Sequence, residues 1–354
     1  MDQYAVPVVW SPETRRHDPQ HEVWVGVATE GTERAERVDA ILDALGTAGH
    51  ELVEATPQPD DVLLDVHDPH LLEFLRTAAA RWAAGPYREL VGQERVVPYL
   101  FPTPAMTAGL QPRPAVAVHA DAGRFAYDTM TLVGPGTWEA ARAAVDCAIN
   151  AVSLVGAGAR LAYALCRPPG HHATPAGFGG SCYLNNAAVA AAALRRTGAA
   201  TVGIVDVDAH QGNGTAAIFY DRPDVRYGSV HVDPGAGWFP HVVGYADETG
   251  TGPGEGATRN LPLPEGTGDE PWLAAVAELA EWVSGCDALV ISLGVDAAAD
   301  DPESPLQVTA DGYREAGRLL GATGLPAVAV QEGGYHLPTL GGLVAAYLEG
   351  HASP

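Results

Sequence analysis

The stretch Asp206-Val-Asp-Ala-His-Gln-Gly-Asn-Gly214 decides the fold and much of the chemistry of this chain. It follows the apolar, β-branched run 201–205, which is too short for a helix and is typical of a buried parallel strand. Two carboxylates and an imidazole therefore stand where a strand ends and a glycine-rich turn begins. In open α/β sheets, ligands bind at that edge. Because unpaired charges are costly to bury, the stretch indicates a metal site.

Around this stretch, predicted strands and helices alternate with short connections. That order predicts an α/β fold with a mostly parallel central sheet and helices on both faces. Thr137, Asp269 and Thr309 are expected to cap helices. Segments 1–30, 85–125 and 235–268 are expected to be irregular. The predicted strands are 161–166, 202–207, 225–232, 288–293 and 326–330, and the predicted helices are 32–45, 70–84, 137–155, 185–196, 214–220, 269–283, 309–320 and 337–348.

The composition limits the classes of protein that fit. The chain has 354 residues, 47% of them hydrophobic, and no shift in composition marks a boundary, so we predict a single domain over 1–354. A formal net charge of −24 argues against nucleic acid or an anionic membrane as a partner. The four cysteines are scattered without a Cys-x-x-Cys pair, and the first residues lack signal-peptide features. We therefore expect buried free thiols and a cytoplasmic protein.

Four predicted strands end in groups that can take part in catalysis. These groups are His171 and His172, the 206–210 cluster, Asp296 and Tyr335. Because the carboxyl ends of parallel strands share one edge of a sheet, we expect these groups to converge. Three of them have a simpler explanation alone: a polar loop for the two histidines, a helix cap for Asp296 and a packed aromatic ring for Tyr335. The 206–210 cluster is harder to explain in that way, because it gathers charge where burial is costly. Their common position at strand ends favours a catalytic site.

Asp208, His210 and Asp296 form a plausible three-ligand metal site. Catalytic zinc keeps three protein ligands and one open position for water or substrate. Carboxylate and imidazole donors suit Zn²⁺ and also Fe²⁺ or Mn²⁺. Asp206 lies two residues before Asp208 and so on the same side of an extended chain. It either ligates a second metal or orients a histidine.

The remaining groups supply acid, base and hydrogen-bond donor. One imidazole of the His171-His172 pair is expected to take a proton from water, and one to protonate a leaving amine. Tyr335 follows two glycines, so its phenol is expected to reach the open metal position and donate to an oxyanion. Together these functions describe amide hydrolysis.

With these residues quoted, the chain resembles the arginase-fold metal-dependent deacetylases, which include the histone deacetylases, and within them the bacterial acetylpolyamine amidohydrolases. The resemblance covers roughly residues 30–350. It rests on Phe125-Ala-Tyr-Asp128, Gly136-Thr-Trp138, Leu165-Cys-Arg-Pro-Pro-Gly-His-His-Ala173, Cys182-Tyr-Leu-Asn-Asn186, the 206–215 stretch, Ser292-Leu-Gly-Val-Asp296 and Glu332-Gly-Gly-Tyr335.

The resemblance implies a role for each motif residue. It implies Asp208, His210 and Asp296 as zinc ligands and Tyr335 as the oxyanion donor. It pairs Asp206 with His171 and Asn213 with His172, which should make His171 the more basic histidine. It also implies a structural K⁺ or Na⁺ held by Asp206, Asp208, His210, Ser229 and Val230.

For the substrate, the resemblance implies that Asp128 lies at the rim of a tunnel whose wall includes Gly180 and residue 181. The family has an aromatic residue before the Cys-Tyr-Leu-Asn segment, whereas this chain has Ser181. Trp238 or Phe239 is expected to supply the opposite wall. No carboxylate lies in 101–119, where polyamine-specific members are expected to carry one; Glu94 and Asp121 are the nearest.

The leading prediction is a zinc-dependent deacetylase of small acylated amines, acetylpolyamines first. The alternatives are a protein acetyl-lysine deacylase and a tailoring deacylase of an N-acylated secondary metabolite. A dinuclear-manganese ureohydrolase and a non-catalytic binding module are further hypotheses. Relatives of the polyamine type pair through an N-terminal insertion, so residues 1–30 are expected to contact a second copy in a homodimer.

Overall fold

Strand β6 (Val202–Asp206), which carries the opening stretch, lies inside an eight-stranded sheet of the order β4-β1-β5-β10-β9-β6-β7-β8. The computed structural model describes residues 5–87, 89, 92–111 and 113–353. Every neighbouring pair of strands in this sheet is parallel, which confirms the predicted fold class. The other strands are β1 (Pro7–Trp10), β4 (Glu51–Glu54), β5 (Leu161–Ala164), β7 (Val225–Val232), β8 (Thr258–Leu263), β9 (Ala288–Leu293) and β10 (Ala327–Gln331).

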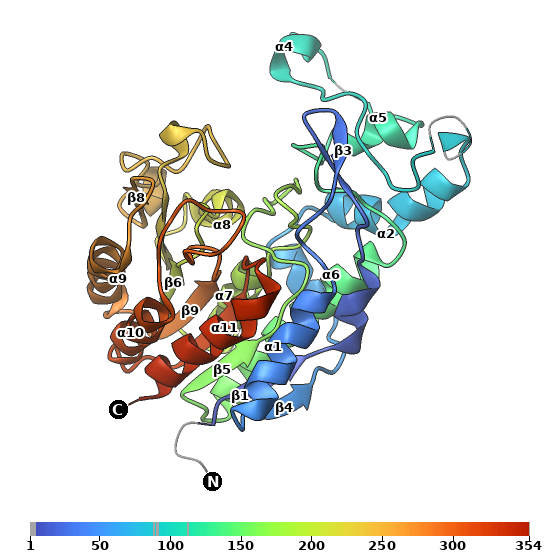
Figure 1. The fold of residues 1–354 in the computed structure, drawn as a ribbon. Helices are drawn as coiled ribbons and strands as arrows, with labels where there is room; N and C mark the ends of the chain where they lie inside the picture. Colours follow the sequence, from blue (N-terminus) through green and yellow to red (C-terminus); the bar gives the residue numbers. More distant parts are fainter. Residues whose placement is uncertain (1–4, 88, 90–91, 112, 354) are drawn as a thin grey trace.

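Helices cover both faces of the sheet (Figure 1). Successive strand residues point to opposite faces, so Val328 and Val330 of β10 enter one apolar cluster while Ala327 and Ala329 enter the other. The first cluster is closed by α2 (Pro69–Ala83), α6 (Thr137–Gly156), α7 (Asn186–Arg196) and α8 (Asn213–Phe219). The second is closed by α1 (Glu36–Thr47), α9 (Asp269–Val283), α10 (Ala310–Gly321) and α11 (Leu337–Ala352).

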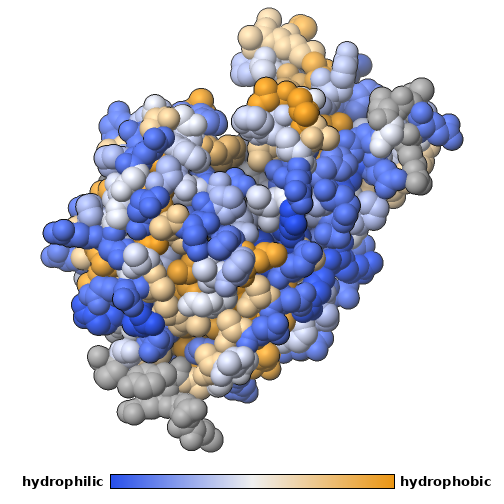
Figure 2. Space-filling model, in the orientation of Figure 1, coloured by the Kyte–Doolittle hydropathy of each residue, from blue (hydrophilic) through white to orange (hydrophobic). Residues whose placement is uncertain are grey.

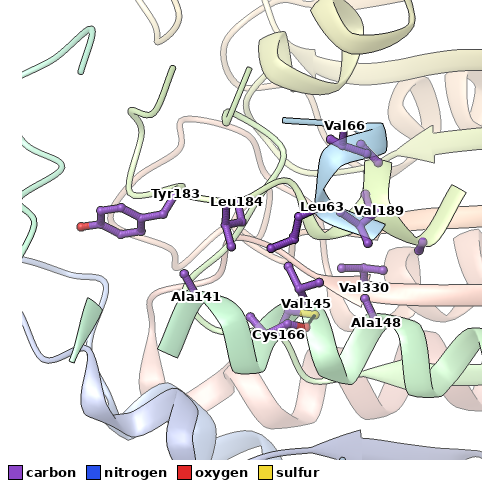
Figure 3. Close-up of a cluster of buried hydrophobic side chains, with 14 of the residues drawn as sticks. Leu63, Val66, Ala141, Val145, Ala148, Cys166, Tyr183, Leu184, Val189 and Val330 are labelled. Atoms are coloured by element: carbon purple, nitrogen blue, oxygen red, sulfur yellow. Dashed lines mark hydrogen bonds between the residues drawn. The ribbon is translucent and has the colours of Figure 1, made fainter. Parts of the chain in front are cut away.

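Helix α6 shows how this packing works. Its buried residues Ala141, Val145 and Ala148 recur at helical spacing and lie beside Leu184 and Val330 in the first cluster (Figure 3). Small residues on this face let the helix approach the strands closely. The packing fixes the strand ends above it, where the site lies.

The prediction that residues 1–30 are irregular is wrong for the described part of that segment, and residues 1–4 lie outside the described residues. Strand β1 pairs with both β4 and β5, and its Val8 and Val9 are fully buried. Strands β2 (Glu22–Trp24) and β3 (Val27–Thr29) form an antiparallel hairpin. Strand β1 was not predicted because prolines flank it and its own sequence shows no clear alternation. Its pairing with β4 and β5 specifies it instead.

The two other segments predicted to be irregular also contain regular structure. Segment 235–268 includes β8, an edge strand paired with β7. Its Pro262 is tolerated because an edge strand needs ladder hydrogen bonds on one side alone. Segment 85–125 includes the short helices α4 (Pro104–Thr107) and α5 (Val118–Ala122).

The predicted helix starts are partly right. Thr309 caps α10 by accepting from the amide of Gly312, as predicted. Thr137 and Asp269 are instead the first residues inside α6 and α9. The carboxylate of Asp269 binds the amide and hydroxyl of Thr309, so it ties two helix starts together. Helix α1 begins at Glu36 rather than at residue 32.

Two further observations concern the chain as a whole. All four cysteines are free and buried, as predicted. Within the described ranges, no helix is long and apolar enough to cross a membrane.

Candidate active site

The predicted groups converge at one edge of the sheet. Strands β6 and β9 pair with Asp206 opposite Ser292, and β9 and β10 pair with Leu293 opposite Gln331. Strand β10 in turn pairs with β5. The carboxyl ends of these four neighbouring strands therefore lead into the 206–210 stretch, Asp296, Tyr335 and the two histidines. The expected convergence is confirmed.

Asp208, His210 and Asp296 lie together at this edge, with one donor atom from each within 4.8 Å of the others. Nδ1 of His210 lies 3.3 Å from Oδ1 of Asp208 and 3.1 Å from Oδ2 of Asp296. The backbone holds both carboxylates, because Gly333 donates to Asp208 at 2.8 Å and Ala209 donates to Asp296 at 2.8 Å. Two buried carboxylates facing one imidazole make a donor set that fits Zn²⁺ or Fe²⁺.

The pKa values in this cluster reflect its crowded charge. Burial acts to raise the pKa of Asp208, but His171 and His210 outweigh burial and hold that pKa well below its usual range. Burial and the charge of Asp208 raise the pKa of Asp296 to about 7. A divalent cation relieves this repulsion between neighbouring carboxylates, so the electrostatics of the cluster also fit a metal.

Two glycines make room for the carboxylates. A Cβ atom at Gly294 would lie 2.0 Å from Oδ2 of Asp208, and one at Gly333 would lie 2.3 Å from Oδ2 of Asp296. No side chain fits at such distances. Gly333, the first glycine before Tyr335, is therefore required by the close approach of the two carboxylates, whereas Gly334 adopts a positive φ of 118° beside Val295.

His171 and His172 lie beside the cluster, each with its expected partner. Nδ1 of His171 lies 3.1 Å from Oδ2 of Asp206, and Nδ1 of His172 lies 2.7 Å from Oδ1 of Asn213. Burial acts to lower the pKa of His171, but Asp208 and Asp206 outweigh it and raise that pKa to about 10. Burial and the neighbouring His171 lower the pKa of His172 well below its usual value. His171 is thus the more basic histidine, in the predicted direction.

Tyr335 faces the same space. Its backbone amide donates to Asp301 at 2.6 Å, and the guanidinium of Arg37 lies 4.8 Å from the centroid of its ring. Burial raises the pKa of Tyr335 well above its usual value, so the phenol stays protonated and can donate a hydrogen bond. Tyr335, His172 and His210 all line one pocket.

Two of the residues predicted to hold a monovalent cation, Ser229 and Val230, lie beside Asp206 on the neighbouring strand. Strand β7 brings Ser229 directly opposite Asp206, with Val230 next to it. Asp206 also accepts from the amide of Asp208 at 3.2 Å and from the hydroxyl of Tyr227 at 3.1 Å. Asp206, Tyr227 and Ser229 therefore bring polar side chains to neighbouring positions of β6 and β7, and the cation itself stays a prediction.

The pocket above the cluster has one aromatic wall. Phe239 packs edge-on against His172 with 4.7 Å between ring centroids, and Gly180 and Ser181 lie on the lining as predicted. Ser181 adopts a positive φ of 63°, which is unusual for a residue with a side chain. Trp238 does not line this pocket; its Nε1 donates to Glu265 at 2.6 Å. Of the two aromatics predicted for the wall, the structure places Phe239 there.

Asp128 lies in an adjoining groove, and its carboxylate organises the pocket wall. Oδ1 accepts from the amides of Met130 and Thr131, and Oδ2 accepts from the amide of Gly180 at 2.6 Å. Both oxygens therefore have protein partners. The predicted contact between Asp128 and a substrate stays a prediction.

Three carboxylates near the site were not predicted. Glu22 on β2 and Glu303 on the loop after β9 line the same pocket as Tyr335. Burial and the charge of Glu303 raise the pKa of Glu22 to about 7. Glu332 is fully buried, and its Oε2 accepts from the amides of Gly170 and His171 at 2.6 and 3.1 Å. No local pattern distinguishes Glu22 or Glu303, whereas the position of Glu332 at a strand end is a usable signal.

Comparison with known proteins bears directly on this geometry. The model of the histone deacetylase domain matches residues 31–351. The chain belongs to the histone deacetylase domain family. The predicted family is therefore confirmed, and the site described above is that of a metal-dependent amidohydrolase.

Relatives within this family match over nearly the whole chain. An acetylpolyamine amidohydrolase of Mycoplana ramosa is 39% identical over 348 residues, covering 98% of this chain and 99% of the relative. One of Burkholderia pseudomallei (strain 1710b) is 43% identical, covering 88% and 87% of the two chains. The crystal structure of acetylpolyamine aminohydrolase from Burkholderia pseudomallei superposes with a TM-score of 0.92 at 37% identity, covering 99% of each chain.

Proposed function

We propose that this protein removes the acetyl group from small acylated amines that carry a second, cationic amine, acetylpolyamines first. Two relatives named for acetylpolyamine hydrolysis cover most of the chain, which supports this substrate class. Zn²⁺ is the metal proposed for Asp208, His210 and Asp296, with Fe²⁺ as the alternative, and a K⁺ or Na⁺ is proposed beside Asp206.

The observation that carries the substrate class is the pair of carboxylates on the pocket wall. Glu22 and Glu303 line the pocket that also exposes His210 and Tyr335. The hydroxyl of Thr32 donates to Glu303 at 2.7 Å and holds that side chain in place. An ammonium group between two partly desolvated carboxylates gains more than it does in water, whereas a neutral chain gains nothing there. The wall therefore supplies the carboxylates that the 101–119 segment lacks.

The residues around the metal site divide the proton transfers between them. A bound metal polarises the amide carbonyl and lowers the pKa of water. Nδ1 of His172 faces the amide oxygen of Asn213, so Nδ1 carries the hydrogen and Nε2 is free to accept a proton from the attacking water. His171, beside Asp206, is the protonated member of the pair, and its positive charge favours the negative charge that develops on oxygen as the amide carbon turns tetrahedral.

Tyr335 completes the arrangement. Its phenol stays protonated and lines the pocket with His172, so it donates to the oxygen that becomes negative as the amide carbon turns tetrahedral. His172 then passes its proton to the departing amine, which leaves as a neutral molecule. The phenol needs no change of protonation in this sequence.

A panel of substrates tests the proposal. Zinc-loaded protein is assayed with N-acetylputrescine, N-acetylcadaverine, a neutral N-alkyl acetamide of the same length and an acetyl-lysine peptide. We expect kcat/KM to be highest for the two acetylated diamines. A preference for the peptide would favour the protein deacylase, and no turnover of any substrate would contradict the proposal.

We further propose that two copies pair through the N-terminal hairpin. Trp24, Val25 and Val27 of the hairpin are 59%, 77% and 63% exposed, and Met106 and Leu110 near α4 are 56% and 75% exposed. Figure 2 shows apolar side chains gathered at the hairpin tip and on α4, where both project above the body of the molecule. Apolar surface of this kind is typical of an interface. Sedimentation velocity is expected to give a dimer for the wild type and a monomer for Val25→Glu.

A further inference from the structure

Glu33 is a fully buried carboxylate that the proposed reaction does not use. It lies between two guanidinium groups, and Glu33, Arg37 and Arg167 are each 1% exposed. Nη1 of Arg37 donates to Oε1 at 2.9 Å, and Nη2 of Arg167 donates to Oε2 at 3.0 Å. His17 also lies near Oε2, but burial lowers the pKa of His17 well below its usual value, so it adds no charge.

The first guanidinium holds the Tyr335 loop. Arg37 donates from Nε to the carbonyl of Gly334 at 2.7 Å and from Nη2 to the carbonyl of Glu332 at 2.5 Å. Its guanidinium also lies over the Tyr335 ring. Arg37 thus fixes the backbone immediately before the phenol that faces the metal ligands.

The second guanidinium holds the histidine loop. Arg167 stands four residues before His171, and its Nη1 donates to the carbonyls of Thr14 and His17 at 2.8 and 2.5 Å. These bonds anchor the start of the segment that carries His171 and His172. The loops of Tyr335 and of the histidines are therefore joined by one carboxylate through two arginines.

We propose that Glu33 is a positioning residue that sets the distance between the Tyr335 phenol and the His171–His172 pair. Its charge keeps the two buried guanidinium groups side by side. Arg37 is hydrogen-bonded to the Tyr335 loop, and Arg167 belongs to the histidine loop. Without that charge the cations repel each other and the loops move apart. A displacement near 1 Å is enough to disturb a reaction that needs the phenol and an imidazole on the same tetrahedral centre.

The first experiment is kinetic and rests on the proposed amide hydrolysis. Glu33→Gln keeps the size of the side chain and removes its charge, so we expect kcat to fall about 10- to 100-fold with a smaller change in KM. The matched control is Glu30→Gln, which changes an exposed carboxylate paired with Arg34 and should leave kcat unchanged. Metal content and the far-ultraviolet circular dichroism spectrum should match the wild type in both variants.

A double-mutant cycle separates positioning from a general loss of stability. If Glu33 acts by placing Tyr335 and His172 together, Glu33→Gln should cost much less in a Tyr335→Phe or a His172→Ala background than in the wild type. A purely structural role would reduce kcat by the same factor in every background. Such multiplicative behaviour would overturn the proposal.

Two further measurements keep the proposal testable in every case. If Glu33→Gln fails to fold, Glu33→Asp keeps the charge but cannot reach both arginines, and a wild-type kcat for it would refute the proposal. Crystal structures of the wild type and of the variant that folds test the proposal without any measurement of enzymatic activity. The variant is expected to show a larger separation between the Tyr335 hydroxyl and His172 than the wild type does. An unchanged separation would refute the proposal even if no substrate is turned over.

Discussion

The floor of the pocket and its wall are built in different ways. The floor consists of residues at the ends of adjacent parallel strands, and hydrogen bonds such as the one from Gly333 to Asp208 fix their side chains. The wall draws Glu22 from the N-terminal hairpin, Phe239 from the loop after β7 and Glu303 from the loop after β9. Chemistry that needs sub-ångström placement therefore sits on the sheet, whereas charge selection is assembled from segments far apart in the chain.

Metal removal should have the largest effect on activity, because it acts on the floor of the pocket and leaves the wall unchanged. Chelation is expected to reduce activity to background, because Asp208, His210 and Asp296 are the site proposed for the metal and nothing on the wall replaces it. Zn²⁺ added back should restore the rate, with metal content followed by mass spectrometry. Full activity in protein shown to be free of metal would contradict the proposed role of the floor.

Tyr335→Phe is expected to have the next largest effect. Loss of one oxyanion donor typically lowers kcat by about 10²–10³-fold. Metal content and KM for N-acetylputrescine should change little, because the wall stays intact. The matched control is Tyr347→Phe, which removes a buried hydroxyl that has no hydrogen-bond partner within the described part of the chain. Equal kcat values for the wild type and Tyr335→Phe would remove the phenol from the mechanism.

The difference between the floor and the wall of the pocket also explains which site residues can be predicted from the sequence. Asp208 and His210 follow an apolar strand within four residues, so the local pattern places them at a strand end. The parallel order of the strands then predicts that Asp296 and Tyr335 lie beside them. Glu22 carries no such signal, because it lies on a short two-stranded hairpin outside the central sheet, in a segment predicted to be irregular.

The supporting charges escape prediction for a related reason. The sequence places Glu33 near the start of a helix, where a carboxylate is common. The structure instead buries it between Arg37 and Arg167, which are 130 residues apart (167 − 37) in the chain. Pairing over such a separation leaves no periodic trace in the sequence. Local pattern therefore predicts the groups that react better than the groups that place them.

Glu303→Gln tests the wall without disturbing the floor. We expect KM for N-acetylputrescine to rise about 5- to 20-fold, since a charge-assisted contact is lost at a partly exposed site. The kcat value and the KM of a neutral N-alkyl acetamide should stay the same. The control Glu278→Gln alters an exposed carboxylate on α9 and should change neither constant. A rise in KM for the neutral amide as well would show that Glu303 shapes the pocket rather than selecting charge.

The smallest expected effect is a pH dependence specific to the wall. The pKa of Glu22 is raised to about 7 by burial and by Glu303, so its ionised fraction grows as the pH rises through 7. KM for acetylated diamines should therefore fall by up to about tenfold between pH 6 and pH 8, while KM for the neutral amide stays constant.

The raised pKa of Glu22 also affects the free energy of unfolding, which should fall as the pH rises while the binding of diamines improves. A carboxyl whose folded pKa is raised favours the neutral form, so its contribution to stability is present at low pH and is lost as the pH rises toward 7. Glu22→Gln should then match the wild type in free energy of unfolding near pH 4 and exceed it by about 1–3 kcal/mol at pH 8. Denaturant titrations at the two pH values measure this difference. If Glu22→Gln and the wild type differ in free energy of unfolding by the same amount at both pH values, then folding does not raise the pKa of Glu22, and the binding of diamines would lose its pH dependence as well.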